Sequence, residues 1–492
     1  MWVKIKHTES MRQDYIEQLV SFLQKLGHTP ESLADLHDKA LLWGATEEEF
    51  AEAVKKSIPL SKPESNLEES HPKDEKKLLK KLVEFDLALH GVVIMLLGVL
   101  ALFLFQTFGE QPTTISSQQA ITKESPLLFP QVYAKSIEVN SQQVFSYPPK
   151  PLTLAISGTP KREIYGYFPY WMLDNQASIP LETLTTLSYF GLTVNKSGSI
   201  ITTYADGTLE KGWQSWSSPQ LQSLITRAKQ NDIHLELTLK SFNNEDIESL
   251  VTSDEAQKTF INNAIQLIQA KAFDGVNLDF EYSGTPDPEI AQGFSRLVTN
   301  LKSEMTQQIP EATLTVSTYV TEAAMPRLIE IEQVSRSVDS FVIMGYDFHT
   351  PSGAPGPVAP LDGPLSITGL IQSYLEKVTP DKIILALPHY GYDWLEDETQ
   401  RDAHRILPFV VVGEESKKYG VQWDEIAKTP WYTYTDESTQ KNRIVHFENT
   451  RSLGLKYDFI NKKDLKGVGI WALGYDGANR EITLLLQEKF MR

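Results

Sequence analysis

The chain of 492 residues contains no cysteine. Disulfides, thiolate metal sites and a cysteine nucleophile are therefore excluded. Positive charge is also in deficit, because 46 Lys and Arg residues stand against 64 Asp and Glu residues and leave a formal net charge of -18. Such a chain repels polyanions, and it has no basic arm or RNA-recognition pattern, so we expect no nucleic-acid partner.

Histidines are few and never grouped. His234, His349 and His389 stand singly, without the His-Glu-x-x-His helix or the paired spacing that a zinc site needs. We therefore expect no metal site and no cofactor, and we interpret these histidines as structural.

One long segment lacks charge altogether. Residues 87–108 hold no Asp, Glu, Lys or Arg, and at about 1.5 Å per residue they would cross the roughly 30 Å hydrocarbon core of a bilayer. A buried soluble helix is an alternative, and a cleaved signal peptide would lie nearer the N-terminus. The sequence predicts a single-pass transmembrane helix.

The charges on either side of this segment predict its orientation. On the N-terminal side lie Lys73, Lys76, Lys77, Lys80 and Lys81, whereas the first basic residue after it is Lys123. The positive-inside rule then places the N-terminus in the cytoplasm and the C-terminal part outside the cell membrane. No residue identifies a cytoplasmic partner.

The remainder of the N-terminal part has little chemistry. Residues 1–58 show helical spacing and predict a small helical region, and residues 59–86 read as a charged tether and juxtamembrane helix. Residues 109–161 are rich in Gln, Ser, Thr and Pro, which is typical of an extended linker.

From residue 162 to residue 492, strand-like runs alternate with helical patterns, which is typical of βα units around a parallel sheet. Eight strands are expected, near 163–170, 185–194, 233–240, 275–282, 313–319, 340–348, 382–390 and 467–475. No Gly-rich phosphate turn opens the first unit, so a (β/α)8 TIM barrel is favoured over a doubly wound α/β sheet. The long gap at about 395–466 predicts a small α+β insertion between strands 7 and 8, ending in a helix near 450–462.

The fourth of these strands carries the most informative motif. Asn277, Asp279 and Glu281 alternate with Val276, Leu278 and Phe280, and alternate side chains of a strand share one face. Two carboxyls about 6–7 Å apart at Cα disturb each other's ionisation, which suits a general acid near neutral pH. The competing interpretation is a solvated edge strand with one polar face.

The motif resembles the active-site strand of family-18 glycoside hydrolases, whose pattern is Asp-Gly-x-Asp-x-Asp-x-Glu. Asp274, Gly275, Asp279 and Glu281 match this pattern, whereas Asn277 replaces its middle Asp. Three other expected strands also resemble strands of this family. The run from Tyr165 to Trp171 resembles the first strand of the family, Met344 to Asp347 the sixth, and Gly469 to Ala472 the eighth.

The resemblance implies a role for each matching residue. Glu281 would be the general acid and then the base, and the nucleophile would be the acetamido oxygen of the substrate, as this family is an exception among retaining glycosidases. Asp279 would hold the acetamido N–H and stabilise the oxazolinium intermediate. Tyr346 would hold the acetamido oxygen, and Trp471 would form the floor of the sugar subsite. Further substrate-lining candidates are Tyr167, Phe190, Met344, Asp347, Tyr392 and Trp394.

Asn277 is a departure with a chemical consequence. An amide can donate a hydrogen bond to Asp279 but cannot share a proton with it. Asn at this place also occurs in bacterial relatives of the spore-cortex-lytic type, so we expect activity to persist with an altered pH profile.

The sequence thus predicts a membrane-anchored, extracytoplasmic hydrolase of β-1,4-linked glycans that contain N-acetylglucosamine. The segments 431–434, 447–452 and 469–475 look most like cortex-lytic members, which favours peptidoglycan over chitin as substrate. Those members commonly carry LysM repeats, which are absent here. The alternative is a catalytically inactive, chitinase-like glycan-binding protein. Such relatives typically lose the acid glutamate that this chain retains as Glu281.

Overall fold

A computed structural model describes residues 158–396, 403–477 and 479–491. The regions expected at 1–58, 59–86 and 87–108, and the expected linker up to residue 157, lie outside the described residues. Within the described residues no helix is long and apolar enough to span a bilayer.

Eight parallel strands close into a barrel in the order β1-β13-β7-β6-β5-β4-β3-β2. Their bounds are β1 (Glu163–Pro169), β2 (Thr186–Thr193), β3 (His234–Ser241), β4 (Gly275–Phe280), β5 (Thr313–Tyr319), β6 (Ser340–Met344), β7 (Ile383–Pro388) and β13 (Gly467–Trp471). Each coincides with one of the eight expected strands, so the barrel prediction is confirmed. The β1–β13 pairing, which aligns Glu163 with Gly467, closes the barrel.

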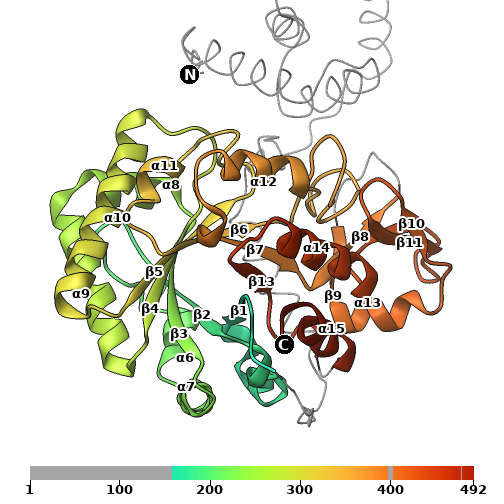
Figure 1. Ribbon diagram of the computed structural model, residues 1–492, viewed down its shortest axis with the longest axis horizontal. Helices are drawn as coiled ribbons and strands as arrows, with labels where there is room; N and C mark the ends of the chain where they lie inside the picture. The colour runs from blue at the N-terminus through green and yellow to red at the C-terminus, as the bar shows by residue number, and fades with distance from the viewer. Residues whose placement is uncertain (1–157, 397–402, 478, 492) are drawn as a thin grey trace, which may run out of the picture. The chain divides into compact units, whose positions relative to one another are not determined.

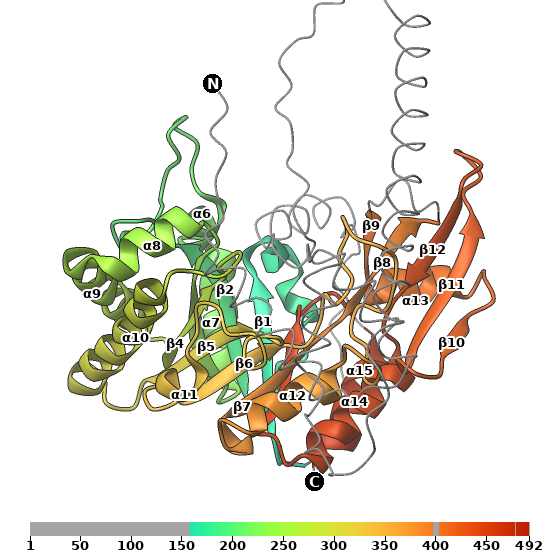
Figure 2. The ribbon, with the colours of Figure 1, turned by 90° about the horizontal axis from the view of Figure 1, so that it is seen from above.

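Helices surround the barrel strands (Figures 1 and 2). They are α6 (Lys211–Trp216), α7 (Pro219–Gln230), α8 (Asn244–Thr252), α9 (Asp254–Lys271), α10 (Pro288–Gln308), α11 (Ile331–Val334), α12 (Ile367–Leu375), α14 (Thr450–Lys462) and α15 (Arg480–Phe490). Short 3-10 helices occupy Tyr170–Ser178, Leu181–Thr183 and Pro380–Lys382. The helix expected near 450–462 is α14, which packs against α15 and β13.

Local sequence signals set the ends of these helices. Ser218 caps α7 by accepting from the Leu221 N–H, and Pro219 stands at the first turn, where it removes no intrahelical hydrogen bond. Ser253 caps α9 in the same way, and α9 ends at Ala272 in the left-handed region, with φ of 50°. This tight stop turns the chain directly into β4.

A separate antiparallel sheet is inserted between β7 and β13, with strand order β10-β11-β12-β8-β9. Its elements are β8 (Tyr390–Leu395), β9 (Ala403–Pro408), α13 (Phe409–Ser416), β10 (Gln422–Asp424), β11 (Thr429–Thr435) and β12 (Asn442–His446). In both views it lies on the α14–α15 side of the barrel, away from α8, α9 and α10 (Figures 1 and 2). The sheet begins earlier than the expected residue 395, because only His389 separates β7 from β8.

Candidate active site

The polar strand β4 is fixed at its start by close backbone contacts. Asp274 accepts a hydrogen bond from the Leu235 N–H at 2.8 Å, which ties the entry of β4 to β3. Gly275 is required by space, since a Cβ built there would lie 2.2 Å from the Thr313 hydroxyl on β5. The Asp-Gly pair therefore sets β4 between β3 and β5, with Asn277 and Asp279 buried inside the barrel.

Glu281 follows β4 at the carboxyl end of the barrel, where βα barrels carry their chemistry. The Tyr319 hydroxyl donates to its Oε2 at 2.9 Å. Burial raises the pKa of Glu281 well above its usual value, and the negative charges of Asp279 and Asp347 raise it further. The raised pKa favours the protonated carboxyl that a general acid requires.

Asp279 is the second carboxyl of the pair, and only 4% of it is exposed. Burial raises its pKa to about 7, against the opposing effects of Ser317 and of the Lys240 charge. Its Oδ1 atom is buried without a hydrogen-bond partner among the described residues. An unpaired buried acceptor is costly in a core and is suited to a bound donor.

Asn277 does not make the hydrogen bond to Asp279 that its sequence position suggests. Its amide nitrogen donates instead to the Thr315 hydroxyl at 3.0 Å, and its oxygen accepts from the Ser317 hydroxyl at 3.0 Å. Both partners lie on β5, because β4 and β5 pair in parallel and place Asn277 opposite Thr315. The amide therefore belongs to a polar network inside the barrel.

Tyr346 and Asp347 lie in the loop that follows β6. Burial raises the pKa of Tyr346, and so do Tyr167 and the charges of Asp279, Asp347 and Glu281. Asp347 adopts a left-handed backbone with φ of 61°. Burial raises its pKa to about 7, although the hydroxyls of Tyr390 and Tyr392 both donate to its Oδ1, at 2.5 Å and 2.8 Å.

Aromatic rings line the β1–β2–β13 side of the barrel mouth. The Trp471 ring lies 5.6 Å from that of Tyr167 and 4.7 Å from that of Phe190, between ring centroids. The charge of Asp279 acts on the Tyr167 phenol, so this cluster adjoins the carboxyl pair. The four groups expected at 279, 281, 346 and 471 thus lie around one end of the barrel.

One of the expected lining residues, Trp394, is placed differently. Trp394 is fully buried in β8, where its indole N–H donates to the Thr350 carbonyl at 3.1 Å and its ring packs beside Tyr392 and His446. Met344 is half-buried at the end of β6, opposite Tyr319 in the β5–β6 register. The contacts of Trp394 are thus with the insertion and its neighbouring loop rather than with the carboxyl pair.

Four residues at the site were not among the expected ones. Ser317 donates to Asn277, and Tyr319 donates to Glu281. The Trp171 ring lies 6.4 Å from the Trp471 ring, and Lys240 on β3 is the register partner of Asp279 on β4. The signal for two of them was present in the sequence. Thr313, Thr315, Ser317 and Tyr319 alternate along β5 just as the polar residues alternate along β4.

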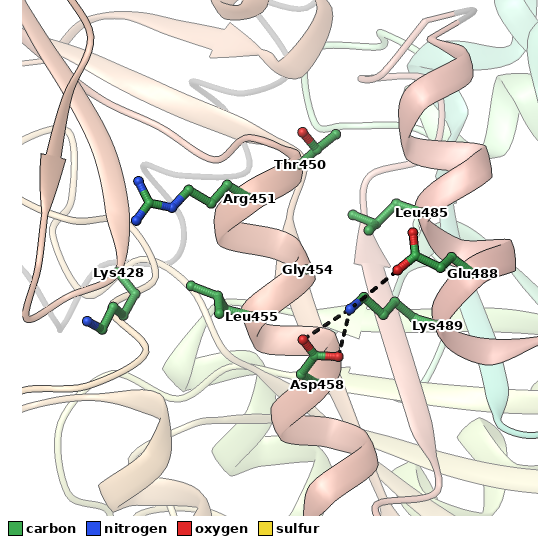
Figure 3. Close-up of a pocket in the computed structure, with 9 residues that line it drawn as sticks. All are labelled: Lys428, Thr450, Arg451, Gly454, Leu455, Asp458, Leu485, Glu488 and Lys489. Atoms are coloured by element: carbon green, nitrogen blue, oxygen red, sulfur yellow. Dashed lines mark hydrogen bonds and ion pairs between the residues drawn. The ribbon is translucent and has the colours of Figure 1, made fainter.

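Other parts of the described chain offer weaker candidates for a functional site. No group of three or more His, Asp or Glu side chains that could hold a metal ion occurs in residues 158–396, 403–477 and 479–491. A hollow of about 410 Å³ lies between α14 and α15 (Figure 3). There Lys489 pairs with Asp458 at 2.8 Å and with Glu488 at 3.6 Å. Lys428 pairs with Glu425, and Arg451 lies over the Trp423 ring.

Comparison with solved structures identifies the same architecture. The Bacillus cereus spore cortex-lytic enzyme SleL aligns with a TM-score of 0.57 at 21% identity, over 68% of this chain and 76% of that one. A GH18 chitinase from Cycas revoluta in complex with (GlcNAc)3 aligns with a TM-score of 0.57 at 18% identity, over 66% of this chain and 99% of that one. At these identities the likeness concerns the fold.

Sequence comparison supplies the family. The cortical fragment-lytic enzyme of Bacillus subtilis is 24% identical over 348 residues, which are 67% of this chain and 75% of that protein. Its counterpart from Bacillus cereus is 24% identical over 303 residues, 59% of this chain and 65% of that protein. The chain thus spans about two thirds to three quarters of the length of these relatives. The model of glycosyl hydrolases family 18 matches residues 163–476, so the chain belongs to this family and is a glycosidase.

Proposed function

We propose that this glycosidase cleaves β-1,4-linked glycans that contain N-acetylglucosamine, with retention and by substrate-assisted catalysis. One observation carries the proposal. Glu281, a carboxyl whose pKa is raised by burial, directly follows the strand that carries a second carboxyl, Asp279, whose buried Oδ1 has no partner among the described residues. The first can donate a proton and the second can accept a substrate N–H.

Each step of the reaction has a residue to perform it. Glu281 protonates the glycosidic oxygen, and the acetamido oxygen of the substrate attacks the anomeric carbon to form an oxazolinium ion. Asp279 accepts the acetamido N–H and stabilises the positive charge. Tyr346 holds the acetamido oxygen in line, and Trp471 stacks on the sugar ring. Glu281, now ionised, then takes a proton from the incoming water.

Peptidoglycan-type glycan is the favoured substrate over chitin. Two of the relatives are named cortical fragment-lytic enzymes and a structural neighbour is named a spore cortex-lytic enzyme, whereas another neighbour is a chitinase in complex with (GlcNAc)3. Both polymers present the 2-acetamido group that the mechanism requires, so the choice between them rests on the other sugar and its substituents.

The test is release of reducing ends by the purified full-length chain from wall glycan and from chitin oligomers, with mass analysis of the products. Glu281→Gln should lower the rate by at least about 10²-fold, the usual contribution of a general acid. Proton NMR of the first product should show the β-anomer. Wild-type protein that binds these glycans without turnover would instead be the glycan-binding alternative.

Membrane anchoring through residues 87–108 is a second part of the proposal. Its support is the uncharged length of that segment and the lysines before it. Residues 162–492 would then lie outside the cell. Protease added to intact cells should digest an epitope placed after residue 492 and spare one placed at residue 1; the reverse pattern, or a chain that washes off membranes at alkaline pH, would refute the anchor.

A further inference from the structure

A second buried carboxyl network lies inside the barrel, below the catalytic pair. Glu236 on β3 is 2% exposed and receives three hydroxyl groups. Tyr165 and Thr315 donate to its Oε2 at 2.7 Å and 2.6 Å, and Thr313 donates to its Oε1 at 2.6 Å. Nothing in the proposed reaction uses this acid, yet burying it is costly.

The network continues from Glu236 to the active site through consecutive contacts. Thr315 lies 3.0 Å from the Asn277 amide nitrogen, the Asn277 oxygen lies 3.0 Å from the Ser317 hydroxyl, and Ser317 lies 2.7 Å from the Tyr167 hydroxyl. Tyr167 packs on Trp471, and Ser317 lies beside Asp279. An unbroken path of hydrogen bonds thus joins Glu236 to the substrate pocket.

A charge on Glu236 fixes the direction of every bond in this path. An ionised carboxylate only accepts, so Thr315 must give it its single proton and can then only accept from Asn277. The Asn277 oxygen is thereby turned toward Ser317 and accepts a hydrogen bond from the Ser317 hydroxyl. Ser317 in turn accepts from Tyr167. The Ser317 proton is thus held on Asn277, which limits the hydrogen bonding by which Ser317 lowers the pKa of Asp279, and the Asp279 Oδ1 atom stays available.

We propose that Glu236 is a positioning residue. From the neighbouring strand β3 it supplies the fixed negative charge that family members carry at the position of Asn277. This charge orients the hydroxyl groups around Asp279. The inference rests on the proposed function for its kinetic readout. Without the charge, Thr315 can donate to Asn277, the amide can rotate, and the Ser317 proton is released toward Asp279.

The groups that face Glu236 are compatible with an ionised state. The titratable ones are Tyr165 and Tyr167 from β1 and His234 from its own strand, and the β5 neighbours Thr313 and Thr315 are neutral donors. The His234 Nε2 lies 3.9 Å from Glu236 and 2.8 Å from Thr313. Burial raises the pKa of Glu236 above its ordinary value, and His234 and the three hydroxyls oppose this rise in part. The geometric support for the ionised form is the three hydroxyl groups that donate to its two oxygens.

The test moves the charge from one strand to the next. Glu236→Gln should lower kcat roughly ten- to hundredfold, the loss typical of misplaced catalytic groups. It should also move the acidic limb of the kcat profile to lower pH, because Ser317, which already lowers the pKa of Asp279, is then no longer held on Asn277 and stabilises ionised Asp279 more strongly. Adding Asn277→Asp should restore kcat to within about threefold of the wild type, since the new carboxylate can accept from both Thr315 and Ser317. A purely structural role predicts no such rescue.

The single Asn277→Asp variant gives a readout that needs no turnover. With Glu236 present, two carboxylates compete for the one Thr315 proton, so the melting temperature should fall; in the Glu236→Gln background the fall should be smaller. Additive shifts would overturn the inference even if no substrate is turned over. So would a Glu236→Gln enzyme with the kcat and pH profile of the wild type, or a double variant no more active than Glu236→Gln.

A matched control separates this role from the general loss of a buried acid. Glu448 is 1% exposed and pairs with Lys456 at 2.7 Å, outside the network. Glu448→Gln should lower the melting temperature but leave the pH profile unchanged, and Asn277→Asp in that background should not restore anything. An equal shift of the pH profile in Glu448→Gln would contradict the proposal. Wild-type inactivity alone would refute only the proposed function.

Discussion

Asp279 shows how a catalytic demand opposes the stability of the fold. Its carboxyl is buried inside the barrel, with one oxygen unpaired among the described residues. The folded protein holds the Asp279 proton more tightly than the unfolded chain does, because burial raises the pKa from 3.8 to about 7. A buried carboxyl of this kind lowers the stability of the folded protein at the place where a ligand binds.

The sign of the resulting pH dependence follows from proton binding. Between about pH 4 and pH 7 the native state binds more protons at this site than the unfolded state does, so stability falls as the pH rises through that window. Asp279→Asn removes the titrating group. The variant should therefore be more stable than the wild type above pH 7, by on the order of 4 kcal/mol for a shift from 3.8 to about 7, and the gain should fade below pH 4.

Urea unfolding of both proteins at pH 4, 6 and 8 measures this difference, and catalysis should be lost at the same time. Thr183→Ala is a suitable comparison, because Thr183 is buried and its hydroxyl donates to the Pro180 carbonyl at 2.8 Å rather than to a carboxylate, so its effect should not depend on pH in this range. A constant difference between Asp279→Asn and wild type at all three pH values would show that the carboxyl is not destabilised by its surroundings.

At the scale of elements, the insertion acts as a rigid support for one side of the site. Asp393 on β8 is fully buried and receives Arg443 of β12 at 2.6 Å and Arg405 of β9 at 3.1 Å. Arg405 also pairs with Glu415 of α13 at 2.8 Å. Buried, multiply bonded ion pairs of this kind favour one specific arrangement of their strands.

The same strand carries the tyrosines that hold Asp347. Tyr390 and Tyr392 alternate with Gly391 and Asp393, so β8 directs its hydroxyls to the loop after β6 while its other face binds the two arginines. The inserted sheet thus sets the position of the Asp347 carboxyl, whose charge raises the pKa of Glu281.

The elements also show what the sequence could and could not predict. Alternation along β4 was enough to place Asn277 and Asp279 on one face, because a strand has a fixed period of two. The partners of Asn277 were not predictable in this way. They depend on the register of β5 against β4, which is set by packing around the whole barrel, and Thr315 and Ser317 are 38 and 40 residues away in the chain.

At the scale of the whole molecule, the alternation of strands and helices predicted the topology because parallel strands with right-handed crossovers leave few ways to close a sheet. The eight expected strands all occur, and the family comparison covers the same region, residues 163–476. The placement of Trp394 was less accessible to sequence reasoning. A tryptophan of the core and a tryptophan that binds sugar look the same in a sequence. The hydrogen bond from the Trp394 indole to the Thr350 carbonyl, which only the structure shows, distinguishes them.

Net charge gives a further prediction at this scale. The chain carries -18, and wall glycan with free muramic carboxylates is itself anionic, so the two repel at long range. This repulsion is screened within about 10 Å at 0.1 M salt but reaches about 30 Å at 0.01 M. The kcat/KM for wall glycan should therefore rise several-fold as salt increases from about 10 mM to about 150 mM.

Neutral chitin oligomers are the internal control for this measurement, because they carry no charge for the protein to repel. Their kcat/KM should stay constant over the same range of salt, while kcat for both substrates is unaffected, since screening acts on encounter rather than on the buried carboxyl pair. If kcat/KM rises equally for both substrates, salt acts on the enzyme itself. If it falls for wall glycan alone, attraction through a local basic surface outweighs the net charge.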